Sequence, residues 1–291
     1  MDAVSRIERS LHGAVGLADI AGAPPRLADA MRHAVFPRGG RIRPRLTLAV
    51  AAACAEDDPA LTDAAGAAIE LMHCASLVHD DLPCFDDAAT RRGRPSVHAA
   101  FGQPLAVLTG DALIVLAFQV LARSGAAQPS RLAALIGVLG RAAGVPSGIV
   151  AGQAWECEDE IDLAQYQRAK TGALFAAATV AGAAAAGAFA EAEGWRRLGA
   201  RLGEAYQVAD DILDVAADAD AVGKPVGQDA AHGRPSAVAR LGLDGARRHL
   251  RGLADEAAES IPPCPGEAEL RQLIRGETRR LMPAEMAAAA A

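Results

Sequence analysis

Two clusters of aspartates, each at the end of an apolar stretch, constrain this chain more than any other feature. The first occupies His79–Asp87, with aspartates at 80, 81, 86 and 87, and the second occupies Tyr206–Asp214, with aspartates at 210, 211 and 214. Carboxylates this close repel one another and raise each other's pKa unless a cation lies between them. Such hard oxygens suit Mg²⁺, which takes one or two carboxylates per ion and completes its shell with water and substrate phosphates. The two clusters and the arginine pair at 91–92 therefore predict a cage for a diphosphate.

The composition favours helices over strands. Hydrophobic residues make up 51% of the chain, aromatic residues only 3%, and strand-like runs of Val, Ile, Thr and Tyr are scarce. No internal repeat or low-complexity linker is evident, so residues 1–291 are expected to form one all-α domain whose tail, 286–291, frays. Apolar periodicity and prolines predict helices at 2–18, 25–36, 41–55, 60–82, 92–101, 104–123, 129–143, 146–158, 163–187, 193–216, 235–258 and 266–281.

Charge and cysteine usage narrow the class of protein. The formal net charge of −7 argues against nonspecific binding of nucleic acid. The five cysteines are scattered and show no metal-ligand spacing, which fits buried thiols in a reducing compartment. The N-terminus has no apolar signal core. These features predict a cytoplasmic protein.

The stretch Gly172–Ala190 contains no charged residue and therefore has to be considered as a membrane span. It consists mostly of Ala and Gly, which drive membrane insertion weakly. A closely packed buried helix is the preferred interpretation, and no transmembrane segment is expected.

Lysine is almost absent from the chain. The 29 basic residues include only two lysines, Lys170 and Lys224. A compact ammonium cannot be exchanged for a guanidinium at a tight site, so these two positions are candidates for a functional role. Chance survival of two lysines is the alternative.

The spacing within each cluster predicts how its carboxylates converge. His73, Ser76 and Asp80 lie on one helical stripe. Asp86 would lie about 240° around a continued helix from Asp80, but Pro83 disfavours continuation, so a loop can return Asp86 toward Asp80. In the second cluster, Asp210 and Asp214 are four residues apart and share one helix face.

These motifs resemble those of the trans-polyprenyl diphosphate synthases. The two aspartate clusters are similar to that family's two aspartate-rich motifs, and they are accompanied by Arg91-Arg92-Gly93 and Gln207. Further matches in family order are Arg41-Ile42-Arg43-Pro44, His73, Gly152-Gln153, Lys170-Thr171 and Gly223-Lys224. Within the family, the segments Leu71–His79, Phe36-Pro37 and Gly227-Gln228-Asp229 look most like the geranylgeranyl diphosphate synthases of bacterial carotenoid and bacteriochlorophyll pathways.

The resemblance implies an all-α bundle around a central apolar cavity, most simply a homodimer, that condenses isopentenyl diphosphate with an allylic diphosphate, head to tail. It implies about three Mg²⁺ ions per active site. Asp80 and Asp86 would hold two of these ions and Asp210 the third. The supporting catalytic aspartates would be Asp81, Asp211 and Asp214.

The resemblance also assigns the remaining site residues to two diphosphates. Arg91 and Lys170, with Lys224 nearby, would hold the allylic diphosphate. Isopentenyl diphosphate would be bound by Arg43, His73 and Arg92. The dipoles of Thr171 and Gln207 would lie near the allylic cation. The more ordinary alternatives are a core histidine at 73, helix-surface roles for 171 and 207, and a buried hydrogen-bonding role for Asp111.

The sequence departs from the family at one substrate-binding position. Gly40 stands where the family usually has a lysine that contacts isopentenyl diphosphate, and Arg38 replaces a glycine. Either Arg38 or Arg41 could reach the same phosphate. The departure also keeps open a noncatalytic subunit that pairs with an active prenyltransferase.

Small residues upstream of Asp80 bear on product length. Ala75 and Ser76 lie about 6–8 Å along the helix from Asp80, and related farnesyl-making enzymes carry a bulky aromatic residue at the place of Ala75. An open channel favours a C20 product, with a floor at Ile69 and Phe118. A farnesyl diphosphate (C15) synthase is the nearest alternative, and a class I terpene cyclase, which needs no second diphosphate site, is the more distant one.

Overall fold

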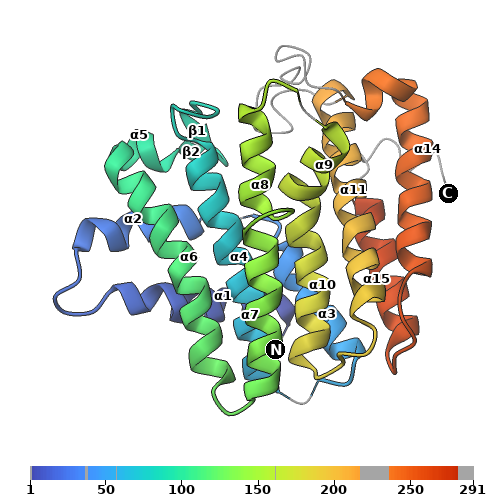
Figure 1. Cartoon of the computed structure of the whole chain (residues 1–291), viewed down its shortest axis with the longest axis horizontal. Helices are drawn as coiled ribbons and strands as arrows, with labels where there is room; N and C mark the ends of the chain where they lie inside the picture. The colour runs from blue at the N-terminus through green and yellow to red at the C-terminus, as the bar shows by residue number, and fades with distance from the viewer. Residues whose placement is uncertain (1, 37–38, 57, 161, 217–235, 281–291) are drawn as a thin grey trace.

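The computed structural model describes residues 2–36, 39–56, 58–160, 162–216 and 236–280, and these form an all-helical bundle (Figure 1). The α-helices are α1 (Ala3–Val15), α2 (Pro25–Val35), α3 (Ile42–Ala53), α4 (Pro59–Asp80), α5 (Val97–Phe101), α6 (Gln103–Gly125), α7 (Pro129–Ala143), α8 (Ile149–Ala154), α9 (Leu163–Gln167), α10 (Ala173–Ala185), α11 (Ala192–Ala216), α14 (Ala237–Glu259) and α15 (Glu267–Arg280). Short 3₁₀ turns η1 (Gly16–Ala18) and η2 (Trp155–Cys157), a π-helical turn η3 (Arg168–Gly172) and strands β1 (Thr90–Arg91) and β2 (Arg94–Pro95) complete these segments. The predicted all-α class is confirmed.

Prolines and caps set the starts of the helices that carry the site. The Asp58 carboxylate accepts a hydrogen bond from the Leu61 N–H at 3.0 Å, and Pro59 follows at the first helical position of α4. Pro104 and Pro129 occupy the first turns of α6 and α7 in the same way. The prolines that predicted breaks in the pattern therefore lie at helix starts, where a missing N–H costs no helical hydrogen bond.

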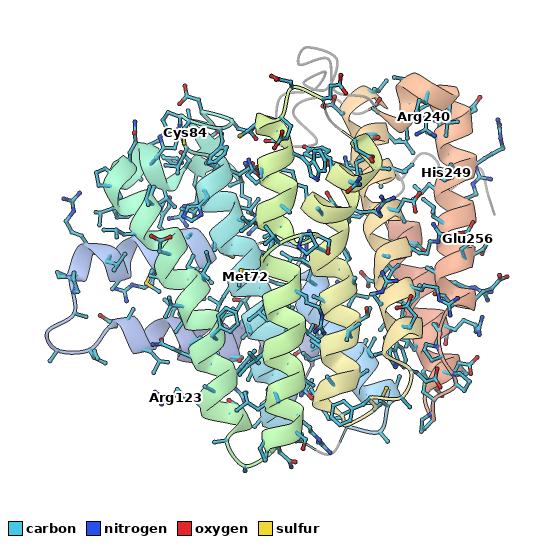
Figure 2. All side chains as sticks on the ribbon, in the orientation of Figure 1. Met72, Cys84, Arg123, Arg240, His249 and Glu256 are labelled. Carbon is cyan, nitrogen blue, oxygen red and sulfur yellow. The ribbon has the colours of Figure 1, made fainter. Side chains whose placement is uncertain are left out.

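Helix α4 lies in the centre of the bundle and packs against α3, α6 and α10 (Figure 1). Most of its residues are buried, including Met72, which Figure 2 places inside the bundle. Helix α14 is amphipathic by contrast, since Arg240, His249 and Glu256 lie on its exposed face (Figure 2). The central, buried position of α4 fixes where its C-terminal aspartates lie.

The charge-free stretch 172–190 forms a packed core helix, as expected. Helix α10 covers its first part and ends before Gly187, whose φ is +78°. A Cβ at Gly182 would lie 2.4 Å from the Thr47 carbonyl oxygen of α3, so only glycine allows this close helix contact. The small residues of α10 thus serve close packing within the bundle.

Helix α6 is the one helix in the described residues whose length and apolarity would suffice to cross a membrane. Of its most apolar 18-residue window, 39% is buried inside the fold. Core helices of water-soluble proteins share these properties.

Four of the predicted helix ranges differ from the structure. The range 235–258 corresponds to α14, which is kinked at Gly242, where φ is +68°. The range 92–101 begins instead with the hairpin of β1 and β2, because Arg92 and Gly93 both adopt positive φ in a two-residue turn, and α5 follows. The range 146–158 is shortened to α8 and η2. The range 163–187 is interrupted by η3, which widens the helix locally. The predicted fraying of 286–291 lies outside the described residues.

Candidate active site

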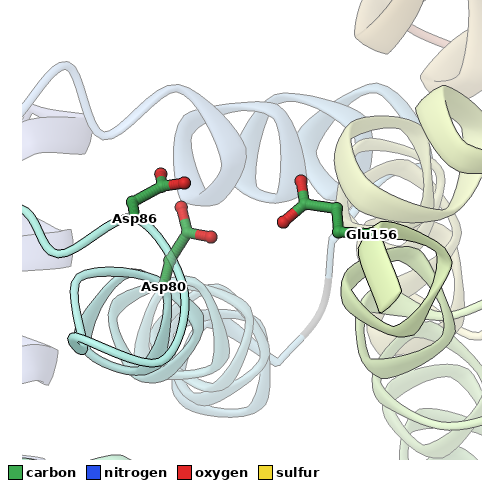
Figure 3. Close-up of side chains that lie close together, drawn as sticks. All are labelled: Asp80, Asp86 and Glu156. Atoms are coloured by element: carbon green, nitrogen blue, oxygen red, sulfur yellow. The ribbon is translucent and has the colours of Figure 1, made fainter. Parts of the chain in front are cut away.

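The first aspartate cluster lies where α4 ends. The chain turns after Asp81, and the Asp86 N–H donates a hydrogen bond to the Asp80 carbonyl at 3.0 Å, so the loop does return Asp86 toward Asp80. Carboxylate oxygens of Asp80, Asp86 and Glu156 all lie within 4.8 Å of one another. Figure 3 shows the three side chains converging from the end of α4, its loop and the helix opposite. These hard oxygen ligands match what Mg²⁺ binds.

Glu156 is a site residue that the sequence analysis did not single out. It lies in η2, and its two oxygens accept hydrogen bonds from Gln153 Nε2 at 3.0 Å and from the Tyr166 hydroxyl at 2.6 Å. The sequence feature that could have identified Glu156 is its position three residues after Gln153, which belongs to the family match Gly152-Gln153. A Cβ at Gly152 would lie 2.4 Å from the Lys170 backbone nitrogen, so this glycine lets α8 approach η3 and bring Glu156 to Lys170.

Lys170 joins the carboxylates from the opposite side. Its Nζ lies 3.1 Å from Asp80 Oδ1 and 2.5 Å from Glu156 Oε1, and 5.7 Å from the centre of the Tyr166 ring. Burial opposes the charge of Lys170, but Asp80, Tyr166 and Glu156 outweigh it and raise the pKa of the ammonium above its ordinary value. Lys170 is therefore a permanent cation at the edge of the acidic group.

The second aspartate cluster is connected to the first through the residue after Lys170. Thr171 Oγ1 donates to Gln207 Oε1 at 3.0 Å, and Gln207 Nε2 donates to Asp211 Oδ1 at 3.0 Å. Asp210 and Asp214 are one turn apart on the same helix, α11, the first half-buried and the second buried. Burial raises the pKa of Asp211, against hydrogen bonds from the Ala237 N–H and Gln207. Lys170 and Thr171 thus stand between the two clusters.

Arg91 is tied to the first cluster. Its guanidinium donates twice to Asp81, with Nε 2.9 Å from Oδ1, and its Nη2 lies 4.0 Å from Asp80 Oδ2. Burial raises the pKa of Asp81, and the hydrogen bond and charge of Arg91 oppose this. Burial likewise opposes the charge of Arg91, but Asp81, Asp80 and Asp86 outweigh it and raise its pKa. Arg91 therefore stays positive beside the carboxylates.

A second group of cations lies around His73, which is on α4 two turns before Asp80. Arg43, at the start of α3, places its Cζ 4.5 Å from the centre of the Phe175 ring, and its Nε is buried without a hydrogen-bond partner. Arg92 lies against Gly39, since a Cβ there would be 2.7 Å from the guanidinium carbon. Burial lowers the pKa of His73 well below its ordinary value, and Arg43 and Arg92 lower it further. Burial also lowers the pKa of Arg43.

Arg43 forms no ion pair or hydrogen bond with an acidic side chain among residues 2–280 as far as the structure describes them, although Glu70 is near enough to act on its charge. A buried guanidinium without an anion is costly, so this group is suited to binding an anion. Helix α3 also begins without a side-chain cap, which leaves first-turn N–H groups that favour negative charge. Arg43 and Arg92 thus lie close enough to His73 for their charges to act on it.

Arg41 is not available to replace the lysine that Gly40 lacks. It is buried, with φ +47°, and donates to Glu8 Oε1, Glu70 Oε1 and the Val35 carbonyl, each at 2.8 Å. All of its guanidinium nitrogens are committed to these partners. Arg38, the other alternative, lies outside the described residues, as do Lys224 and the segment 227–229.

Asp111 differs from its expected role as a buried hydrogen-bonding group. Its side chain is 60% exposed, and its Oδ1 lies 3.9 Å from His79 Nε2. The prediction that Asp111 is buried is wrong. Its neighbours Thr109 and Gly110 are buried instead, and His79 packs against Gly110. A polar residue on an apolar helix need not face the core.

The polyprenyl synthetase family model matches residues 24–269 of the chain. The chain belongs to this family. It is 55% identical over 283 residues to a geranylgeranyl diphosphate synthase of Cereibacter sphaeroides, covering 97% of this chain and 98% of that protein. A geranylgeranyl diphosphate synthase of Rhodobacter capsulatus is 53% identical over 277 residues, covering 95% of each chain.

Solved structures show the same fold. A geranyltransferase from Helicobacter pylori, complexed with magnesium and isoprenyl diphosphate, superposes with a TM-score of 0.79 at 28% identity, covering 96% of this chain and 98% of that one. This polyprenyl synthetase therefore has an isoprenoid synthase fold, as predicted.

Proposed function

We propose that this polyprenyl synthetase condenses isopentenyl diphosphate with allylic diphosphates, head to tail, and releases geranylgeranyl diphosphate (C20). The observation that carries the proposal is the pairing of two unlike sites at the end of α4. Asp80, Asp86 and Glu156 with Lys170 form a metal-dependent diphosphate site, and the unpaired Arg43 marks a second anion site. The two relatives named as geranylgeranyl diphosphate synthases support the product assignment.

The acidic side holds the allylic substrate through Mg²⁺. Asp80 and Asp86 would hold two ions, with Glu156 close enough to contribute. Asp210, supported by Asp81, Asp211 and Asp214, would hold a third. When bound, Mg²⁺ neutralises the charge that develops on the departing diphosphate. Arg91 and Lys170, with Lys224 in the family's order, hold the same diphosphate directly. These cations favour the separation of the diphosphate from the allylic carbon.

The polar side chains nearest the reacting carbon are held in place by one another. The hydrogen bonds from Thr171 to Gln207 and from Gln207 to Asp211 fix the direction of both dipoles. Their oxygens stabilise the allylic cation while the apolar walls exclude water that would quench it.

The basic side holds isopentenyl diphosphate. Arg43, His73 and Arg92 grip its diphosphate, so that its double bond faces the allylic carbon and forms the new carbon–carbon bond. The proton lost afterwards goes to the departed diphosphate, which is why no side-chain base is required. A neutral His73, favoured by its lowered pKa, acts as a hydrogen-bonding ligand in the resting site.

The length of the product is decided on α4. Ala75 is fully buried and offers only a methyl group, so the growing chain passes it and stops deeper, at buried Ile69 and half-buried Phe118. A C20 product follows from this depth, whereas a bulky side chain at 75 would stop the chain at C15.

The enzyme forms a single domain, works in the cytoplasm without crossing a membrane or binding nucleic acid, and supplies carotenoid biosynthesis. It pairs as a homodimer through α6. That helix leaves Val107, Leu108 and Val115 exposed on one face, which a second copy would cover. Light scattering on the protein and on Val115→Arg tests this pairing, and a wild-type monomer would contradict it.

One assay tests the function. The purified chain is incubated with isopentenyl diphosphate, Mg²⁺ and a C5, C10 or C15 allylic primer, and the products are separated by chromatography. A C20 diphosphate is expected. A C15 product would indicate a farnesyl diphosphate synthase, a cyclic hydrocarbon would indicate a terpene cyclase, and no product from the chain alone would favour the noncatalytic subunit.

A further inference from the structure

Tyr206 lies beside the basic site without a role in the chemistry described so far. It precedes Gln207 on α11, and its ring centre is 5.4 Å from that of Phe175. Phe175 is the ring over which the Arg43 guanidinium lies at 4.5 Å. Tyr206, Phe175 and Arg43 therefore form one contiguous row that ends at the unpaired cation.

The hydroxyl of Tyr206 makes no hydrogen bond within the described part of the chain. The other tyrosine, Tyr166, donates to Glu156 at 2.6 Å. A half-buried phenol ordinarily finds a partner for its O–H. Tyr206 is also close enough to Arg43 that a negative charge on the phenol would act on the guanidinium. The two donors thus share one region and lack an acceptor there.

A diphosphate supplies the missing acceptor. Its oxygens accept hydrogen bonds from a guanidinium and from a phenol at once, and hydrogen bonds to a charged acceptor are the stronger kind. Among the described residues, no basic side chain takes the place of the lysine that Gly40 lacks, because Arg41 is committed to Glu8, Glu70 and Val35.

We propose that the Tyr206 hydroxyl donates a hydrogen bond to the diphosphate of isopentenyl diphosphate beside Arg43, and so replaces the donor that Gly40 lacks. This rests on the proposed function, since it assigns that substrate to the basic site. Tyr206 is then a binding residue that sets the affinity for the homoallylic substrate.

The substitution Tyr206→Phe tests the proposal because it removes the hydroxyl and keeps the ring on Phe175. The KM for isopentenyl diphosphate is expected to rise about tenfold, the usual effect of losing a hydrogen bond to a charged group. The kcat and the KM for the allylic diphosphate should change by less than about twofold. The melting temperature should change by no more than about two degrees. A purely structural role would instead change the melting temperature or both KM values.

Tyr166→Phe is the matched variant, since it removes the only other tyrosine hydroxyl, on the acidic side. Its hydrogen bond to Glu156 predicts a change in the KM for the allylic diphosphate and none in that for isopentenyl diphosphate. The assignment is supported if Tyr206→Phe raises only the KM for isopentenyl diphosphate and Tyr166→Phe changes only the KM for the allylic diphosphate. An unchanged KM for isopentenyl diphosphate in Tyr206→Phe would overturn it.

Calorimetric titration of isopentenyl diphosphate into wild type and Tyr206→Phe, without Mg²⁺, separates this inference from the proposed function. Weaker binding by the variant supports the hydrogen bond even if the wild type forms no product, in which case only the proposed function fails. Equal binding, with a wild type that turns over normally, overturns the inference alone.

Discussion

The ammonium nitrogen of Lys170 lies 3.1 Å from the Asp80 carboxylate, although the two residues are 90 positions apart in the sequence. The same nitrogen lies 2.5 Å from Glu156. A single cation thus holds the end of α4, η2 and η3 together.

Replacing Lys170 with methionine should lower kcat/KM for the allylic diphosphate by about 100-fold or more, since it removes a fixed charge that stabilises the leaving group. The KM for isopentenyl diphosphate should stay within twofold. The kcat/KM of Lys170→Arg should lie between the values of wild type and Lys170→Met, because the guanidinium keeps the charge but not the compact shape. Arg251→Met, on exposed α14, serves as the control. Equal losses for both substrates would contradict a specific allylic role.

Asp86 and its neighbour Asp87 offer a matched pair for testing metal binding. Asp86→Asn should reduce activity by about 100-fold, as removal of a catalytic charge partner does, and should raise the Mg²⁺ concentration needed for half-maximal rate. Asp87→Asn should stay within about twofold, because Asp87 is outside the carboxylate group and its φ of +47° suits asparagine. Titration of Mg²⁺ at saturating substrate measures the maximal rate and the half-maximal Mg²⁺ concentration of each variant. An identical Mg²⁺ dependence for Asp86→Asn and wild type would exclude Asp86 as a ligand.

His73 should make the protein less stable in acid. Its pKa in the folded state is lowered by burial and by Arg43 and Arg92, so the unfolded chain binds this proton more readily. Stability must therefore fall as the pH drops below the ordinary histidine pKa of about 6.5 and approaches the lower folded value. Urea unfolding at pH 7.5 and 5.5 measures the prediction. The free energy of unfolding should fall more between these two pH values for wild type than for His73→Asn. A larger loss for the variant would reverse the predicted sign.

Ala75→Tyr should shorten the product from C20 to C15. The added ring would block the path proposed for the growing chain, five residues upstream of Asp80, and packing it into a buried site should cost about 1–3 kcal/mol of stability. Chromatography of the dephosphorylated products measures the chain length. Ala60→Tyr places the same side chain at an exposed position of α4 and should leave C20 unchanged. A C20 product from Ala75→Tyr would remove this residue from the control of length.

Much of the fold could be anticipated because helix signals are local. Pro59, Pro104 and Pro129 lie at helix starts, and the alanine-rich α10 is a packed core helix as its composition indicated. The hairpin at 90–95 was not predicted. Its turn needs positive φ at both Arg92 and Gly93, and the identity of these two residues does not by itself indicate that conformation. Asp111 was misplaced for a similar reason, since the direction of one side chain depends on how the helix rotates against its neighbours.

By itself, the sequence determined the helical class and the positions of the two aspartate clusters, because apolar periodicity and spacing along a helix are properties of short segments. The tertiary structure alone decided which partners those residues have. It brought Glu156 to Asp80 and Lys170, committed Arg41 to Glu8 and Glu70, and left Arg43 and Tyr206 without acceptors among the residues that the structure describes. These outcomes depend on contacts between helices far apart in the chain, and packing sets them only when the whole bundle is assembled.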